Sequence, residues 1–435
     1  MLQTIINALK VKDIRRKVYM MLLLLLVFRI GCFIPVPGLD REVFGSAIAT
    51  NDFLTLMSSI TGGALSQGTL FALGIGPYIN ASIIMQLLSV GIPALERLSK
   101  QGEEGRKKIA QYTRYVTILL AVIQSVGIVV GFGNSAIQTH LFFNQTWLAG
   151  VFMAIVYTAG AFIVMWLGER ITDYGVGNGQ SMIIFVGILA TAGDAIVGKF
   201  GVIFGGDTGA IWELIAFALV SAIIFFAIVY VDLSERKVPV QYAKQIKGRK
   251  MYGGQSSAIP IRISGGGVMP LIFSFSILSF PQMICSMVDP DSTGWFTIFW
   301  NNYMSAAAEG WGAVVYAIVL CLLIFAFSFF YAQMQFNPED ISRSIQQNGG
   351  FIHGIRPGKA TEAYLKKISN RITLFGAIYL SLVAFIPSVA FAWAAWDLVN
   401  VFSTTGILII VSVAMEFEKQ MQAQLMMKNH KGFLK

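Results

Sequence analysis

The sequence predicts an all-α polytopic membrane protein with ten transmembrane helices in two inverted halves. Of its 435 residues, 55% are hydrophobic and only 13% are charged, against roughly 25% charged in soluble domains. Ten apolar stretches are long enough, or nearly so, to cross a hydrocarbon core of about 30 Å at about 1.5 Å per residue. In the resulting topology, 29 of the 32 lysine and arginine residues lie on one side of the membrane.

Hydropathy and charge fix the spans and their direction. We place the spans near residues 18–36, 74–93, 115–132, 147–168, 180–198, 211–231, 267–288, 311–333, 372–394 and 398–415. Basic loops stay in the cytoplasm, so both ends of the chain are expected there. The first span follows a basic segment and lacks a small-residue cleavage site, so we expect a retained helix.

The glycine-rich outer connection at 198–209 separates two groups of five spans. Because five is odd, the second group crosses the membrane in the opposite direction to the first. Inverted halves commonly form the working site at their interface. We therefore predict an N-terminal half at 1–205 and a C-terminal half at 206–435.

The outer segment 37–73 breaks the pattern of short connections. Its apolar part, 61–73, is too short to cross a bilayer and is typical of a re-entrant segment. It leads through Gly74-Ile-Gly-Pro-Tyr78 into a full span, which predicts a broken helix. Non-helical backbone at membrane depth is tolerated only inside protein or beside a water-filled cavity, so we expect a cavity here.

Two cytoplasmic loops, 232–266 and 334–371, are too long to be simple connections. In the second, Asn337 is a predicted cap, followed by Pro338 in the first turn and by acidic residues at the positive end of the helix dipole. Gly349 and Gly350 are expected to end that helix. Such a loop indicates a docking surface.

The chain lacks motifs of several enzyme classes. It contains no phosphate-binding G-x-x-x-x-G-K-[ST] motif and no H-E-x-x-H zinc motif, and its three histidines are far apart in sequence. We therefore expect no catalytic activity, no metal and no cofactor. A secondary transporter would need a charged or polar cluster between the halves, and an intramembrane enzyme would need a facing catalytic pair. A scaffold without a pore is disfavoured by the broken helix.

Arg29 is the one charge well inside a span, and we expect it to have a structural role. Uncharged polar residues also occur within or next to spans, namely Asn80, Ser82, Gln86, Gln124 and Ser264. They are either hydrogen-bonding contacts between fixed helices or part of a seam that opens.

Several motifs together resemble the SecY family, the large channel subunits of the Sec translocon, over essentially the whole chain. They are 28–38 (FRIGCFIPVPG), 62–67 (GGALSQ), 71–83 (FALGIGPYINASI), 102–115 (GEEGRKKIAQYTRY), 165–172 (MWLGERIT), 175–179 (GVGNG), 241–244 (QYAK), 336–338 (FNP) and 354–358 (GIRPG).

The resemblance implies a protein-conducting channel between two halves that hinge apart. A short re-entrant plug helix at about 61–72 would close its outer funnel, with plug residues Gly62, Gly63, Ala64, Leu65, Ser66 and Gln67. The pore ring would consist of Ile75, Ile79, Ile184, Ile272 and Ile409. An apolar ring offers no hydrogen bonds to a passing chain and hinders ions by dewetting. Gln180 stands where the family usually has another aliphatic residue, so its place in the ring stays open.

The resemblance also implies a lateral gate between spans two and three and spans seven and eight. Its polar cluster would be Asn80, Gln124 and Ser264. Arg356 matches the family's basic residue for docking a motor or ribosome. Basic residues of the earlier loop would share that surface or serve only as topology determinants, namely Arg236, Lys237, Lys244, Lys247, Arg249 and Lys250.

The implied setting is a bacterial cytoplasmic membrane, in which this multi-pass subunit works with several partners. They are the SecE and SecG subunits, the SecA ATPase, the ribosome, unfolded secretory polypeptides with their signal sequences, and the lipid bilayer.

Overall fold

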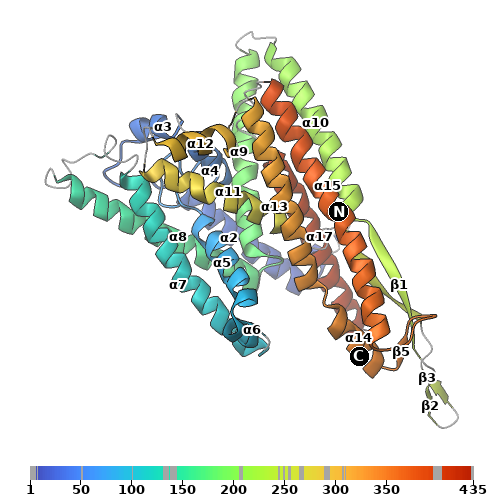
Figure 1. Cartoon of the computed structure of the whole chain (residues 1–435). Helices are drawn as coiled ribbons and strands as arrows, with labels where there is room; N and C mark the ends of the chain where they lie inside the picture. Colours follow the sequence, from blue (N-terminus) through green and yellow to red (C-terminus); the bar gives the residue numbers. More distant parts are fainter. Residues whose placement is uncertain are drawn as a thin grey trace.

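The structure is a computed structural model of the whole chain and is mostly helical (Figure 1). It describes residues 6, 8–49, 52–99, 101–130, 137, 145–204, 209–242, 245–247, 250–252, 256–263, 269–288, 294–305, 308, 310–394 and 404–432.

A helix overlaps every predicted span, which confirms the predicted all-α polytopic class. These helices are α2 (Lys12–Gly31), α5 (Gly76–Gly91), α7 (Glu103–Ile128), α8 (Thr146–Tyr174), α9 (Gly179–Phe204), α10 (Gly209–Asp232), α11 (Met269–Val288), α13 (Trp311–Gln335), α15 (Lys359–Ala394) and α17 (Thr404–Gly432). Within the described ranges, α8, α9, α13 and α15 are each long and apolar enough to cross a membrane unaided. The pair of α5 and α6 (Pro93–Ser99), bent by 104°, would add a fifth span.

The long helices pack as two groups, α2 to α9 and α10 to α17, that meet along seams. In Figure 1, α10, α13, α15 and α17 run nearly parallel in one bundle, α7 and α8 lie on the opposite side, and α11 lies between them. One seam is formed by α5 and α7 against α11, and another by α9 against α10 and α17. The central hydrophobic cluster takes buried side chains from both groups, among them Phe28, Ile184 and Ile409.

Short helices cover the outer side. They are α3 (Arg41–Ala49), α4 (Asp52–Ile60) and α12 (Trp295–Tyr303).

The expected helix at 61–72 is wrong, because residues 61–75 form successive turns and the short helix α4 ends at Ile60. Gly62 has a φ of 74° and Gly63 a φ of 82°. An α-helix requires negative φ at every residue, and these two glycines therefore stop it.

Strands from both long loops, 232–266 and 334–371, join in one sheet. Strand β1 (Glu235–Tyr242) pairs antiparallel with β4 (Ser256–Arg262) on one side and with β5 (Gly350–Phe351) on the other. β2 (Gln245–Lys247) and β3 (Lys250–Tyr252) form a separate hairpin. Helix α14 (Pro338–Gln347) begins as predicted, since the Asn337 side chain accepts a hydrogen bond from the Glu339 backbone at 3.1 Å.

A small hydrophobic core holds this sheet against α14 and α15. It contains Val238, Val240, Ile261, Ile345, Ile352 and Leu365. At the end of α10, shortly before β1, Lys419 of α17 forms an ion pair with Asp232 at 2.7 Å and also donates to the Asp232 backbone carbonyl. The hydrophobic core therefore ties the sheet to α14 and α15, and the ion pair joins α10 to α17 close to where β1 begins.

Leu365→Ala should loosen the cytoplasmic sheet, because Leu365 is fully buried in its core. A large-to-small change at such a site costs about 2–5 kcal/mol. We expect trypsin to cleave within 232–266 several-fold faster in the purified protein, while the membrane fragments stay intact. Asn370→Ala, at an exposed position of the same helix, is the control. An unchanged cleavage rate for Leu365→Ala would contradict this packing.

Candidate functional site

An apolar cavity of about 100 Å³ lies where the two helix groups meet. Its walls come from α2, α4, α5, α7, α9, α11 and α17, and from the turns that follow α4. All five predicted ring residues line it: Ile75, Ile79, Ile184, Ile272 and Ile409. The structure thus brings together side chains spread over 335 positions of the chain.

The ring is held by packing alone. Ile75, Ile184, Ile272 and Ile409 are buried, and Ile79 is half-buried against the same cluster. Aliphatic side chains make no directional bonds, so the ring separates without leaving any of its own polar groups unpaired. Such a contact closes tightly and still deforms around an object of variable width.

Gln180 is half-buried in the first turn of α9 and is not among the residues that line the cavity. A Cβ placed on Gly168 would lie 3.5 Å from the Gln180 Cγ and 3.4 Å from the Ile75 Cδ1. The Gln180 side chain therefore runs along α8 beside Ile75.

The segment after α4 is seated on α2 and α9 by a few specific contacts. Arg29 donates to the Gly62 carbonyl at 3.1 Å, which gives this charge the expected structural role. Thr191 donates to the Ser59 carbonyl at 2.7 Å. A Cβ on Gly187 would lie 2.5 Å from the Ile60 carbonyl oxygen, so the absence of a side chain at Gly187 permits this close approach.

The predicted plug residues differ in exposure. Ala64 and Leu65 are buried, and Gln67 is exposed. The turns are fixed internally, since the Ser66 hydroxyl donates to the Gly63 carbonyl at 3.0 Å and the Thr69 hydroxyl to the Ala64 carbonyl at 3.0 Å. The segment is thus a compact body with an apolar inner face.

Two of the three predicted gate residues, Asn80 and Gln124, also line the cavity and lie on α5 and α7. Ser264 lies outside the described residues. Opposite them, α11 contributes Ser276 and Ser279 to the same lining. The α5–α7–α11 seam therefore carries polar side chains in apolar surroundings.

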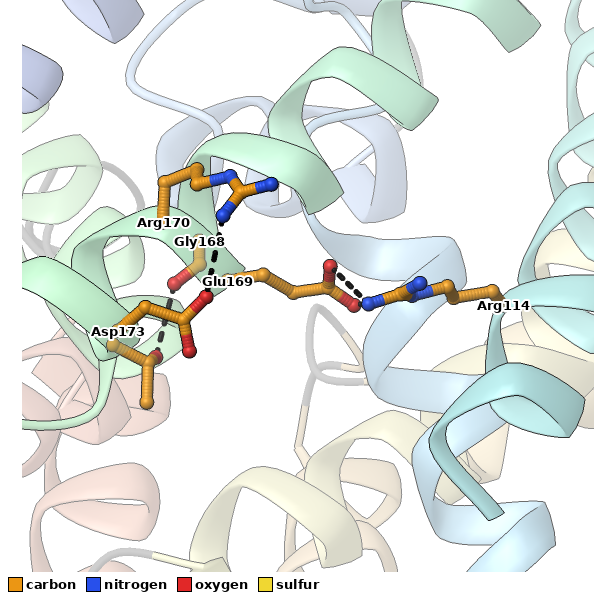
Figure 2. A network of polar contacts seen from close by, with 6 residues as sticks. Arg114, Gly168, Glu169, Arg170 and Asp173 are labelled. Atoms are coloured by element: carbon orange, nitrogen blue, oxygen red, sulfur yellow. Dashed lines mark hydrogen bonds and ion pairs between the residues drawn. The ribbon is translucent and has the colours of Figure 1, made fainter. Parts of the chain in front are cut away.

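A polar network that the sequence did not predict joins α7 to α8 (Figure 2), and a further hydrogen bond joins α8 to α9. Arg114 binds Glu169 through two hydrogen bonds of 2.8 Å each. Arg170 lies 3.6 Å from Asp173 and stacks on the neighbouring aromatic rings of α8. The Thr172 hydroxyl accepts from the Gly179 backbone at 2.9 Å. The 165–172 and 175–179 motifs therefore fix a helix–turn–helix junction.

The predicted docking residues lie on the cytoplasmic sheet and the adjoining loop. Arg356 is exposed and lines an open pocket of about 590 Å³ together with Gly350, Phe351 and Pro357. Arg236 and Lys237 are exposed on β1. Lys247 and Lys250 are paired positions of the β2–β3 hairpin. Lys244 and Arg249 lie outside the described residues.

Comparison with known proteins gives a consistent result. The SecY family profile matches residues 69–418. The chain is 41% identical over 444 residues to "Protein translocase subunit SecY" of Halalkalibacterium halodurans, covering all of both chains. Its fold is similar to a solved protein-conducting channel (TM-score 0.66, 20% identity, 94% of this chain and 92% of that one). It is also similar to Sec61 in the canine ribosome–channel complex (TM-score 0.61, 19% identity, the same coverage). The chain belongs to the SecY family.

Proposed function

We propose that this chain is the central protein-conducting channel of the Sec translocon in a bacterial cytoplasmic membrane. It passes unfolded secretory polypeptides across that membrane and releases transmembrane segments sideways into lipid. The observation that carries the proposal is the ring of five isoleucines, drawn from both helix groups, around one cavity. The names of the family relatives support the same activity.

The ring acts as a deformable seal. When the channel is closed, its apolar walls exclude water and ions by dewetting. When a polypeptide enters, the side chains separate around it without offering hydrogen bonds that would trap one sequence. The glutamine at 180, placed beside Ile75, leaves this inner surface aliphatic.

The turns at 61–72 act as a plug on the outer side. The hydrogen bonds that attach them to neighbouring segments include Arg29 to the Gly62 carbonyl and two backbone bonds, Leu70 to Ile34 and Val36 to Gly68. A buried hydrogen bond contributes about 1 kcal/mol net, so the plug is held and remains displaceable. The glycines of this segment and of α9 permit the close seating that makes the closed state tight.

A lateral gate opens along the seam of α5 and α7 against α11, with Asn80, Gln124 and Ser264 as its polar residues. An apolar segment of about 20 residues inside the pore gains free energy by moving through this seam into hydrocarbon. A hydrophilic segment gains nothing and continues across. The gate therefore sorts segments by partitioning.

The chain supplies no energy source, so it depends on partners at its cytoplasmic face. We propose that SecA and the ribosome dock on the β4–β1–β5 sheet and on the loop that carries Arg356. Exposed Arg236 and Lys237 suit ribosomal phosphates, and such contacts weaken with salt. SecE and SecG complete the membrane complex.

Removing residues 61–69 should raise resting ion leak in vesicles that contain the reconstituted complex, because the plug is lost. Gly187→Val should raise it by a smaller amount, since its side chain would collide with the Ile60 carbonyl. Gly193→Val is the matched control, because a Cβ there has no neighbour within 4 Å. Unchanged conductance after the deletion would contradict the plug assignment.

Arg356→Glu should abolish SecA-driven export in inverted membrane vesicles, because it reverses the charge at the docking pocket. Membrane insertion of proteins that do not use SecA should stay near normal. Lys366→Glu, on an exposed face of α15, controls for the added negative charge. Normal SecA-driven export by the Arg356→Glu variant would show that Arg356 is not part of the docking surface.

A further inference from the structure

A side-chain hydrogen bond crosses between the two helix groups on the cytoplasmic side of the cavity. The Tyr331 hydroxyl of α13 donates to the Gln86 Oε1 of α5. The Gln86 Nε2 in turn donates to the Ser82 hydroxyl at 3.3 Å. Tyr331 and Gln86 are 245 residues apart in sequence, so the contact depends on how the two groups of helices dock.

The Tyr331 side of this bond lies in an apolar environment. Tyr331 is buried, and its ring centroid lies 5.1 Å from that of Phe273 on α11. Both residues belong to the hydrophobic cluster that contains the isoleucine ring. A hydrogen bond with little competing water is strengthened, and a buried tyrosine hydroxyl usually has a partner.

The position along α5 places the pair on the seam. Gln86 follows Ile79 by seven residues, which is about two helical turns, and so points to the same side of α5. Ile79 lines the cavity. Gln86 therefore continues the cavity-facing side of α5 for about 10 Å toward the cytoplasmic end.

Hydrogen bonds between helices that stay together only add rigidity. The Tyr331–Gln86 bond instead joins a helix of one group to a helix of the other, and these must move apart if a segment is to leave sideways. Packed aliphatic side chains give way gradually, whereas a hydrogen bond is lost over a short displacement because it depends on distance and angle.

We propose that Tyr331 and Gln86 form a latch of the lateral gate, with Ser82 orienting the Gln86 amide. The inference rests on the proposed channel function. Both are positioning residues, because they hold the closed arrangement of α5 and α13 and contact no reacting group. The latch sets how apolar a segment must be before the seam opens.

A double-mutant cycle tests the latch in the complete translocon, reconstituted in vesicles. The variants are Tyr331→Phe, Gln86→Leu and the two combined. Ribosome-bound nascent chains carry test segments of graded leucine content, and the inserted and translocated fractions are measured. Each single variant should raise the insertion-to-translocation ratio of a marginal segment roughly threefold, and the combined variant should add nothing further, because one bond is shared.

Tyr379→Phe is the matched control. Its hydroxyl, in the same half as Tyr331, is buried without a hydrogen-bond partner among the described residues, so its removal should leave the ratio unchanged. If the combined variant raised the insertion-to-translocation ratio about ninefold, the product of two threefold effects, the two residues would act separately. Unchanged ratios in both single variants would also overturn the latch.

A second measurement does not depend on the stability of those variants. Gln86→Cys and Tyr331→Cys are combined in a background that lacks the three native free cysteines, and are bridged by a cleavable bifunctional thiol reagent. Bridging should block insertion of a strongly apolar segment, and cleavage should restore it. Continued insertion by the bridged protein would reject the latch. An unmodified complex that neither inserts nor exports would instead reject the proposed function.

Discussion

The structure depends on one apolar contact region, lined by five isoleucines from α5 and its N-cap, α9, α11 and α17. Burial of this kind stabilises the closed arrangement in proportion to the area hidden, at about 25 cal/mol per Å². It imposes no fixed geometry, so the same side chains can close on each other or on a passing chain. The seams between the helix groups and the turns after α4 are arranged around this contact.

Backbone carbonyls anchor the turns after α4. Arg29 donates to the Gly62 carbonyl, and Thr191 holds the end of α4 through the Ser59 carbonyl, so neither anchor depends on a side chain of the accepting residue. Elsewhere polar contacts fix helices that stay together, as in the Arg114–Glu169 pair.

The sequence predicted all ten long helices, because hydropathy and basic loops act over whole segments. Resemblance to a family, and not periodicity, identified Ile75 and Ile409 as neighbours. The predicted plug helix was wrong, because Gly62 and Gly63 adopt positive φ angles that end a helix where the apolar pattern predicted one. Two further features could not be foreseen, the pairing of β1 with β5 and that of Gln86 with Tyr331. Each joins distant segments, and no local signal specifies such a contact.

The most direct test of the channel is crosslinking of a stalled secretory chain from inside the ring. Ile79→Cys and Ile272→Cys, one from each half, would be placed in a cysteine-free background and probed with a chain carrying a thiol-reactive group midway across the membrane. Both positions should crosslink, whereas Leu119→Cys, on an exposed face of α7, should not. Crosslinks only at Leu119→Cys, with none at the ring, would contradict passage through the isoleucine ring.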